Sequence, residues 1–235
     1  MLASINYGVT GQATETMPMT LPIFPLNTVL FPGVRMPLRI FEERYLRMLA
    51  DRTPNDPAFA ISLIVSGREA GDTPAFREVG TTARLVSIDA LSANRVDIVV
   101  VGDRRIRFSS ADWTRGYAVA ETEDMPDGPV DPTGTAGLAI DAHQAYAAYV
   151  RGIARLVEMR FSVPVISLDT AAASYELASR LPLHTWEQQA VLENVHPLAR
   201  MHEVQALLDR ELALLFKGGV AGVPIFSPGD RFTLN

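Results

Sequence analysis

The chain of 235 residues contains no cysteine, and Lys217 is the single lysine among its 21 basic residues. The absence of cysteine excludes disulfide bonds, thiol catalysis and zinc sites built from cysteine, and it fits a cytoplasmic location. No basic residue precedes Arg35, and no apolar run approaches the roughly 18 residues of a membrane span. We therefore expect no signal peptide and no membrane partner, and we predict a cytoplasmic protein.

An excess of positive charge is also missing, because the formal net charge is −6. Proteins that bind nucleic acid generally carry a basic surface, so this charge argues against a nucleic-acid partner. The densest basic run, Arg104, Arg105 and Arg107, leaves an RNA-binding protein open as an alternative. Alternation along a strand would send Arg105 and Arg107 to solvent, with Ile106 and Phe108 facing the core.

Motifs for catalysis and metal binding are missing as well. His202-Glu203 begins the HExxH pattern of zinc proteases, but Ala206 stands where the second histidine is needed. The sequence contains neither the GxxxxGK[ST] loop that cradles nucleotide phosphates nor the GxSxG turn of many hydrolases. We therefore predict no catalytic residue, no metal and no cofactor. A hydrolase whose site is assembled from residues distant in sequence is the alternative.

The first half of the chain holds short strand patterns separated by turn formers. Pro22 and Pro25 cannot donate ladder hydrogen bonds, so we expect residues 21–26 to form an edge strand or an irregular lead-in. Many short strands indicate a small antiparallel barrel or sandwich. Further strands are predicted at 59–65, 79–89, 95–101, 104–109 and 117–122.

Two other local patterns stand among these strands. Pro32-Gly33 suits a tight turn, which predicts a hairpin between residues 29–31 and 34–38. Apolar residues then recur with helical spacing over residues 41–53, and charged residues occupy the other face. This pattern predicts one short amphipathic helix inside the β-rich half.

The second half reads as helical, after a segment rich in proline and glycine. Asp169 is placed to cap a helix over 170–180, and residues 185–188 match a capping box. The fold class predicted is α+β. Its predicted parts are a flexible extension at 1–19, a β-barrel at 20–125, a linker at 126–136, a helical bundle at 137–217 and a flexible tail at 218–235.

Six stretches form an ordered set of motifs. They are LPIFPLNTVLFPG at 21–33, MPLRIFEERYLRML at 36–49, FAISLIVSGREAG at 59–71, EVGTTARL at 78–85, VVVGDRRIRF at 99–108 and LPLHTWEQQAVLE at 181–193. Together they resemble the N-terminal substrate-binding domain of ATP-dependent Lon proteases, a domain that bacteria also possess alone. The resemblance implies an N-terminal PUA-like antiparallel β-barrel with a short helix, followed by a C-terminal helical bundle.

The resemblance also implies a non-catalytic module that recognises unfolded or tagged polypeptides. We expect a free-standing form without the ATPase and protease modules of the family, working with a separate ATP-dependent protease. A stiff, apolar groove near the Pro32-Gly33 turn would lose little entropy on binding, although its apolar side chains could equally be core. The candidate polypeptide-binding residues are Pro25, Phe31, Pro32, Arg35, Arg39, Glu42 and Tyr45.

Overall fold

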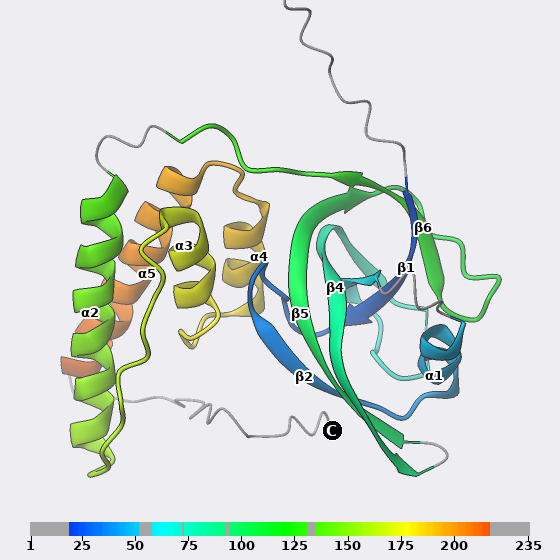
Figure 1. The fold of residues 1–235 in the computed structure, drawn as a ribbon, viewed down its shortest axis with the longest axis horizontal. Coiled ribbons are helices and arrows are strands. Elements are labelled where there is room, and N and C mark those ends of the chain that lie inside the picture. Colours follow the sequence, from blue (N-terminus) through cyan, green and yellow to red (C-terminus); the bar gives the residue numbers. More distant parts are fainter. Residues whose placement is uncertain (1–18, 52–57, 72, 93–94, 131–134, 217–235) are drawn as a thin grey trace, which may run out of the picture.

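The computed structural model describes residues 19–51, 58–71, 73–92, 95–130 and 135–216. These residues form six strands and five helices, with the strands in the first half and four of the helices in the second (Figure 1). The predicted α+β class is therefore confirmed. The predicted flexible extension and tail lie outside the described residues, except for Met19, which begins the first strand.

The sheet of the first half closes on itself. Its strand order is β2-β5-β4-β3-β1-β6, and an additional β5–β6 pairing closes a ring that leaves β2 outside. β5 is 14 residues long, so it pairs with β2 near its start and with β6 near its end. The strands are β1 Met19–Leu26, β2 Arg35–Ile40, β3 Ala58–Ser66, β4 Ala75–Ser92, β5 Arg95–Phe108 and β6 Ala118–Asp124. The PUA-like assignment of this sheet stays a prediction.

Strand β1 corrects two expectations. It lies between β3 and β6 and is not an edge strand, and its pairing with β3 is parallel, so the sheet is not wholly antiparallel. The first half of β1 pairs with β6 up to Ile23, and the second half pairs with β3 from Ile23 onward. Pro22 and Pro25 therefore each have a strand partner on one side only, which is how a proline is tolerated inside a sheet.

The Pro32-Gly33 turn forms as predicted, but the hairpin does not. The Val34 N–H donates to the Phe31 carbonyl oxygen at 3.1 Å, and Gly33 has a φ of 77°, as the third position of such a turn requires. Residues before the turn do not pair with β2. Instead the turn lies on β5, where Gly33 N–H donates to the Gly102 oxygen at 2.8 Å and Gly102 N–H donates to the Val34 oxygen at 3.0 Å.

Gly102 explains a second wrong prediction. The sequence Gly102-Asp103 was expected to break the chain into two strands, whereas β5 runs straight through it with a shift of register against β4. A Cβ on Gly102 would overlap the backbone of Phe31. This glycine therefore serves a close approach of two backbones and not a turn.

Helix α1 Glu43–Ala50 is the predicted short amphipathic helix. Its buried residues are Tyr45 and Met48, whereas Phe41, which was expected on the apolar face, lies before the helix and is exposed. The Tyr45 ring packs on Phe24 of β1, with 4.2 Å between ring centroids. The helix thereby covers the apolar residues at one end of the sheet.

Four helices form the second half: α2 Thr135–Leu156, α3 Thr170–Ala178, α4 Thr185–Glu193 and α5 Pro197–Phe216. The predicted cap is confirmed, because the Asp169 carboxylate accepts a hydrogen bond from the Ala172 N–H at 2.8 Å. The capping box lies one residue earlier than predicted, because Glu187 accepts from the N–H of His184 at 2.9 Å. None of the described helices is long and apolar enough to cross a membrane.

Both halves contribute to one hydrophobic core. Phe31 and Val79 from the first half belong to the same buried cluster as Tyr175, Leu192 and Val204 from the helices. In addition, the Gln189 side chain of α4 donates to the Val79 carbonyl oxygen at 3.0 Å. The contact between the halves is therefore packed like an interior.

Replacing Gly102 by alanine should destabilise the fold. The added Cβ would overlap the Phe31 carbonyl oxygen, which belongs to the backbone and cannot rotate away. We expect a loss of about 1–3 kcal/mol in the free energy of unfolding, measured by urea titration. Gly137→Ala in α2 is the matched control, because a Cβ there meets nothing within 4 Å. An unchanged stability of Gly102→Ala would contradict the close approach.

Candidate functional site

A pocket of about 220 Å³ opens where the two halves meet. We call it the junction pocket. Contributions come from the 31–34 turn, the end of β5, the segment after β6 and α3. It is lined by Pro32, Asp103, Arg104, Arg105, Asp124, Met125, Pro126, Asp127 and Tyr175.

Arg105 forms the floor of this region and was wrongly expected in solvent. Its side chain is 2% exposed, because the helices cover the face of β5 from which it projects. The guanidinium donates to the Tyr175 hydroxyl at 2.6 Å, to the Met125 carbonyl oxygen at 2.9 Å and to an Asp127 carboxylate oxygen at 2.8 Å. It also donates to the carbonyl oxygens of Leu192 and Asn194, each at 3.2 Å.

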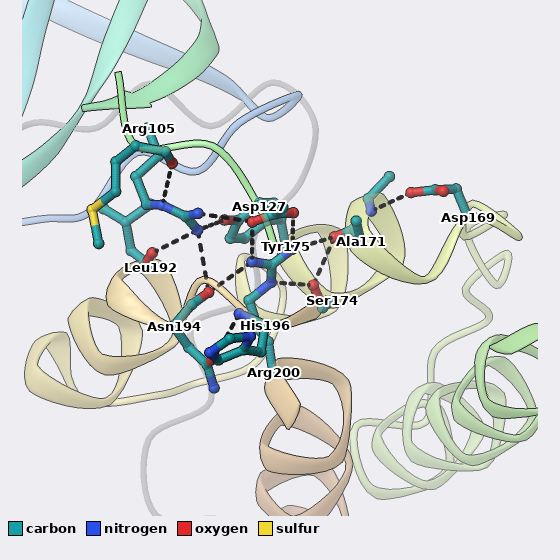
Figure 2. Close-up of polar contacts among 12 residues, drawn as sticks. Arg105, Asp127, Asp169, Ala171, Ser174, Tyr175, Leu192, Asn194, His196 and Arg200 are labelled. Atoms are coloured by element: carbon teal, nitrogen blue, oxygen red, sulfur yellow. Dashed lines mark hydrogen bonds and ion pairs between the residues drawn. The ribbon is translucent and has the colours of Figure 1, made fainter. Parts of the chain in front are cut away.

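Arg200 of α5 approaches the same carboxylate from the other side. It is fully buried and forms a bidentate pair with Asp127, with N–O distances of 2.8 and 2.7 Å. Its remaining donors reach the Ser174 hydroxyl at 2.8 Å and the Asn194 carbonyl oxygen at 2.8 Å. Figure 2 shows the guanidinium groups of Arg105 and Arg200 converging on Asp127.

Tyr175 connects this cluster to the 31–34 turn. Its ring stacks on Phe31, with 5.6 Å between centroids, and the Arg200 guanidinium lies 3.9 Å from the ring centroid. Burial raises the pKa of the Tyr175 hydroxyl, so this group remains a neutral hydrogen-bond partner at physiological pH. We call Arg105, Asp127, Tyr175 and Arg200 the junction cluster.

The charge balance of the junction cluster determines the protonation of Asp127. Burial by itself would raise the pKa of this carboxyl. The hydrogen bonds and positive charges of Arg200 and Arg105 outweigh burial, so the pKa lies below its ordinary value. Asp127 is therefore a stable anion between two cations.

The predicted polypeptide-binding residues do not form one surface. Pro25, Phe31 and Tyr45 are buried, and burial raises the pKa of Tyr45 to about 12. A polypeptide cannot touch these three without rearrangement of the fold. Phe31 nevertheless supports the junction pocket from below through its stack on Tyr175.

The other four predicted residues are at least partly accessible but lie apart. Pro32 lines the junction pocket. Arg35 is exposed at the start of β2, and Arg39 forms an ion pair with Asp97 of β5 at 2.8 Å. Glu42 accepts hydrogen bonds at the start of α1 from Arg44 and from the Gly71 N–H, each at 3.1 Å.

Sequence reasoning missed most of the junction cluster. Asp127 lies in the proline-rich segment that was interpreted as a linker. Arg105 belongs to a run of arginines that was interpreted as surface. Arg200 did leave a signal, because it falls beside Met201 on the apolar face of α5, where a charged residue needs a buried partner.

The chemistry of the pocket suits binding. Asp103 and Asp124 at its rim both pair with Arg104, at 3.5 and 2.7 Å. Within the described ranges, no group of three or more histidine, aspartate or glutamate residues is arranged to hold a metal ion.

Removing the shared carboxylate should destabilise the protein more than removing one arginine. Asp127→Ala leaves two buried guanidinium groups without a counter-charge, and we expect a loss of about 3–5 kcal/mol in unfolding free energy. Arg200→Met leaves the Arg105–Asp127 pair in place and should cost less. Arg104→Met is the control, because this arginine is 46% exposed and its ion pairs should contribute about 1 kcal/mol or less. Equal losses in all three variants would contradict this ranking.

The depressed pKa of Asp127 also predicts a pH dependence. A carboxyl whose pKa is lower in the folded than in the unfolded state adds stability above its unfolded pKa of about 4. That contribution is lost as the pH falls through the folded pKa. The stability difference between wild type and Asp127→Asn, measured by urea unfolding, should therefore be constant near neutral pH and shrink below about pH 4. A difference that grows on acidification would refute this assignment.

Comparison with known proteins extends these observations. Residues 20–210 match the sequence model of the ATP-dependent protease La (LON) substrate-binding domain. Lon protease of Roseiflexus castenholzii is 27% identical over 211 residues, which cover 88% of this chain and 26% of that protein. Lon protease 2 of Myxococcus xanthus is 26% identical over 213 residues, which cover 86% of this chain and 25% of that protein. The chain thus spans about a quarter of the length of these relatives.

Solved structures agree with this result. A Lon N-terminal domain protein from Xanthomonas campestris superposes with a TM-score of 0.56 at 25% identity, covering 80% of this chain and 98% of that one. The N-terminal domain of Lon protease from the Mycobacterium avium complex has a TM-score of 0.60 at 15% identity, covers 81% and 98%, and shows the same fold. The match over residues 20–210 establishes that the chain belongs to the family of LON substrate-binding domains.

Proposed function

We propose that this chain is a non-catalytic binding module that recognises unfolded or tagged polypeptides at the junction pocket. The observation that carries the proposal is the pocket itself, which places apolar side chains beside a charged rim. Pro32, Met125 and Pro126 supply the apolar part, and Arg104 with Asp124 supplies the charges. Such a mixture suits the alternating apolar and polar side chains of an unfolded chain.

The size of the pocket supports a polypeptide over a small cofactor. Pockets for drug-sized ligands usually enclose about 300–1,000 Å³. The junction pocket, at about 220 Å³, is smaller and has room for one or two side chains. An extended polypeptide could insert a side chain here while its backbone crosses the surface.

The rigidity of the pocket supports the same function. Its walls are held by the junction cluster and by the Pro32 turn on β5. A preformed site loses little conformational entropy on binding, so weak and unspecific contacts suffice for useful affinity.

The remaining parts of the proposal rest on family membership. The matched relatives bear the name Lon protease and are more than three times as long as this chain. We propose that the chain presents polypeptides to a separate ATP-dependent protease in the cytoplasm. The RNA-binding alternative loses support, because Arg105 is buried and Arg104 is paired with Asp124.

Pro126→Asp should weaken polypeptide binding. The change puts a carboxylate into the apolar part of the pocket, and we expect about tenfold lower affinity, or about 1.4 kcal/mol. The measurement is fluorescence anisotropy of a labelled, permanently unfolded polypeptide titrated with purified protein. Intact-mass analysis of the same sample should find the polypeptide uncut, since fragments would favour the hydrolase alternative.

Pro129→Asp is the matched control. Pro129 is exposed on the same segment, three residues further on, and does not line the pocket. If both variants bind as tightly as wild type, the polypeptide does not use the junction pocket. If wild type does not bind at all, the proposed function fails.

A further inference from the structure

The far end of the helical half carries a second surface that polypeptide binding in the junction pocket does not use. α2 ends there at Leu156, and the chain turns back through Met159 and Arg160. The apolar side chains are well exposed: Leu156 at 53%, Met159 at 55% and Phe216, at the end of α5, at 76%. We call this the tip surface. It consists of Arg151, Arg155, Leu156, Met159, Arg160 and Phe216.

The tip surface is basic although the protein is acidic. Arg151, Arg155 and Arg160 are all exposed, and none of them has an ion pair with another described residue. Glu158 is the one carboxylate inside this stretch. Net charge is −6 over the whole chain, so three arginines and one glutamate in ten residues are a local reversal of sign. Exposed arginine beside exposed apolar side chains is typical of protein interfaces.

The backbone of the tip is held in a fixed shape. Met159 N–H donates to the Ala154 oxygen at 3.0 Å and Glu158 N–H donates to the Arg155 oxygen at 3.4 Å, which closes α2 with a Schellman motif. The left-handed position of this motif is normally glycine, but here it is Glu158, with a φ of 52°. A side chain in that conformation costs on the order of 1 kcal/mol, and such outliers often mark functional segments.

Packing joins the ends of α2 and α5 and separates them from the junction pocket. A Cβ on Gly152 would lie 3.7 Å from the Leu215 side chain, so the two helix ends are in contact. Figure 1 shows α2 running from the side on which β6 ends to the opposite side of the molecule. A helix of 22 residues is about 33 Å long, so a partner on the tip surface would leave the junction pocket open.

We propose that the tip surface docks an acidic segment of a second protein, one that carries apolar side chains between its carboxylates. An acidic segment is favoured because its negative charge complements the arginines of the tip surface. The C-terminal residues 217–235 of the chain itself are a poor match, because they contain Lys217 and Arg231 against a single acid, Asp230. An anionic lipid surface is disfavoured by the net charge of the whole protein and by the packing of α2 along α5. The inference goes beyond the proposed function and does not depend on it.

The test uses two fluorescein-labelled peptides and the full chain. One peptide repeats the unit Glu-Asp-Leu-Phe, and the other has lysine in place of each acid. Wild type should bind the acidic peptide saturably in an anisotropy titration, with an affinity that falls as salt is added. The double variant Arg155→Glu/Arg160→Glu should bind it at least about tenfold more weakly. Arg84→Glu, with its arginine exposed on β4, is the matched control and should bind like wild type.

The outcomes separate this proposal from its rivals. Equal binding of the two peptides, or no effect of the double variant, would overturn it. So would sedimentation of wild type, but not of the double variant, with phosphatidylglycerol vesicles, since a lipid would then be the occupant. Self-association that disappears in the double variant, measured by light scattering, would assign the surface to a second copy of the chain. The Pro126→Asp variant should still bind the acidic peptide, so a failure of the proposed function can be distinguished from a failure of this proposal.

Discussion

One carboxylate, that of Asp127, holds the two halves of this protein together. It lies on the segment between β6 and α2 and forms an ion pair with one arginine from each half, Arg105 of β5 and Arg200 of α5. Without it both arginines would be buried with no counter-charge, which is strongly unfavourable. The segment between β6 and α2 is therefore held to both halves by these ion pairs, and the junction pocket takes its shape from them.

The contacts around Asp127 make the boundary between the halves an interior. Phe31 from the turn stacks on Tyr175 of α3, and Tyr175 in turn stacks under Arg200. Apolar burial and charge pairing thus depend on the same side chains, so neither can change alone. Domains that move freely meet through smaller and more polar surfaces. The polypeptide site proposed here is consequently a rigid feature of one folded body.

Local chemistry made much of the fold predictable. The cap at Asp169 and the turn at Pro32-Gly33 depend on neighbouring residues, and both formed where expected. Features that depend on contacts between residues distant in sequence left no such local signal. The sequence around Gly102 looks like a break between strands, and only the approach of the 31–34 turn explains it. Of the candidate binding residues, Pro32 lines the junction pocket. The burial of Arg105 could not be predicted, because its partners in the helical half follow it by 70 residues or more.

The pairing of β1 also has a consequence for biosynthesis. The Thr122 hydroxyl of β6 donates to the Met19 carbonyl oxygen of β1 across 103 residues of chain. On the ribosome, β1 emerges before β3 and β6, so its first half lacks its native partner until β6 has been translated. Apolar strand edges that wait for a late partner are prone to wrong association. The first half of β1 therefore stays an unpaired strand edge until the last strand of the sheet has been made.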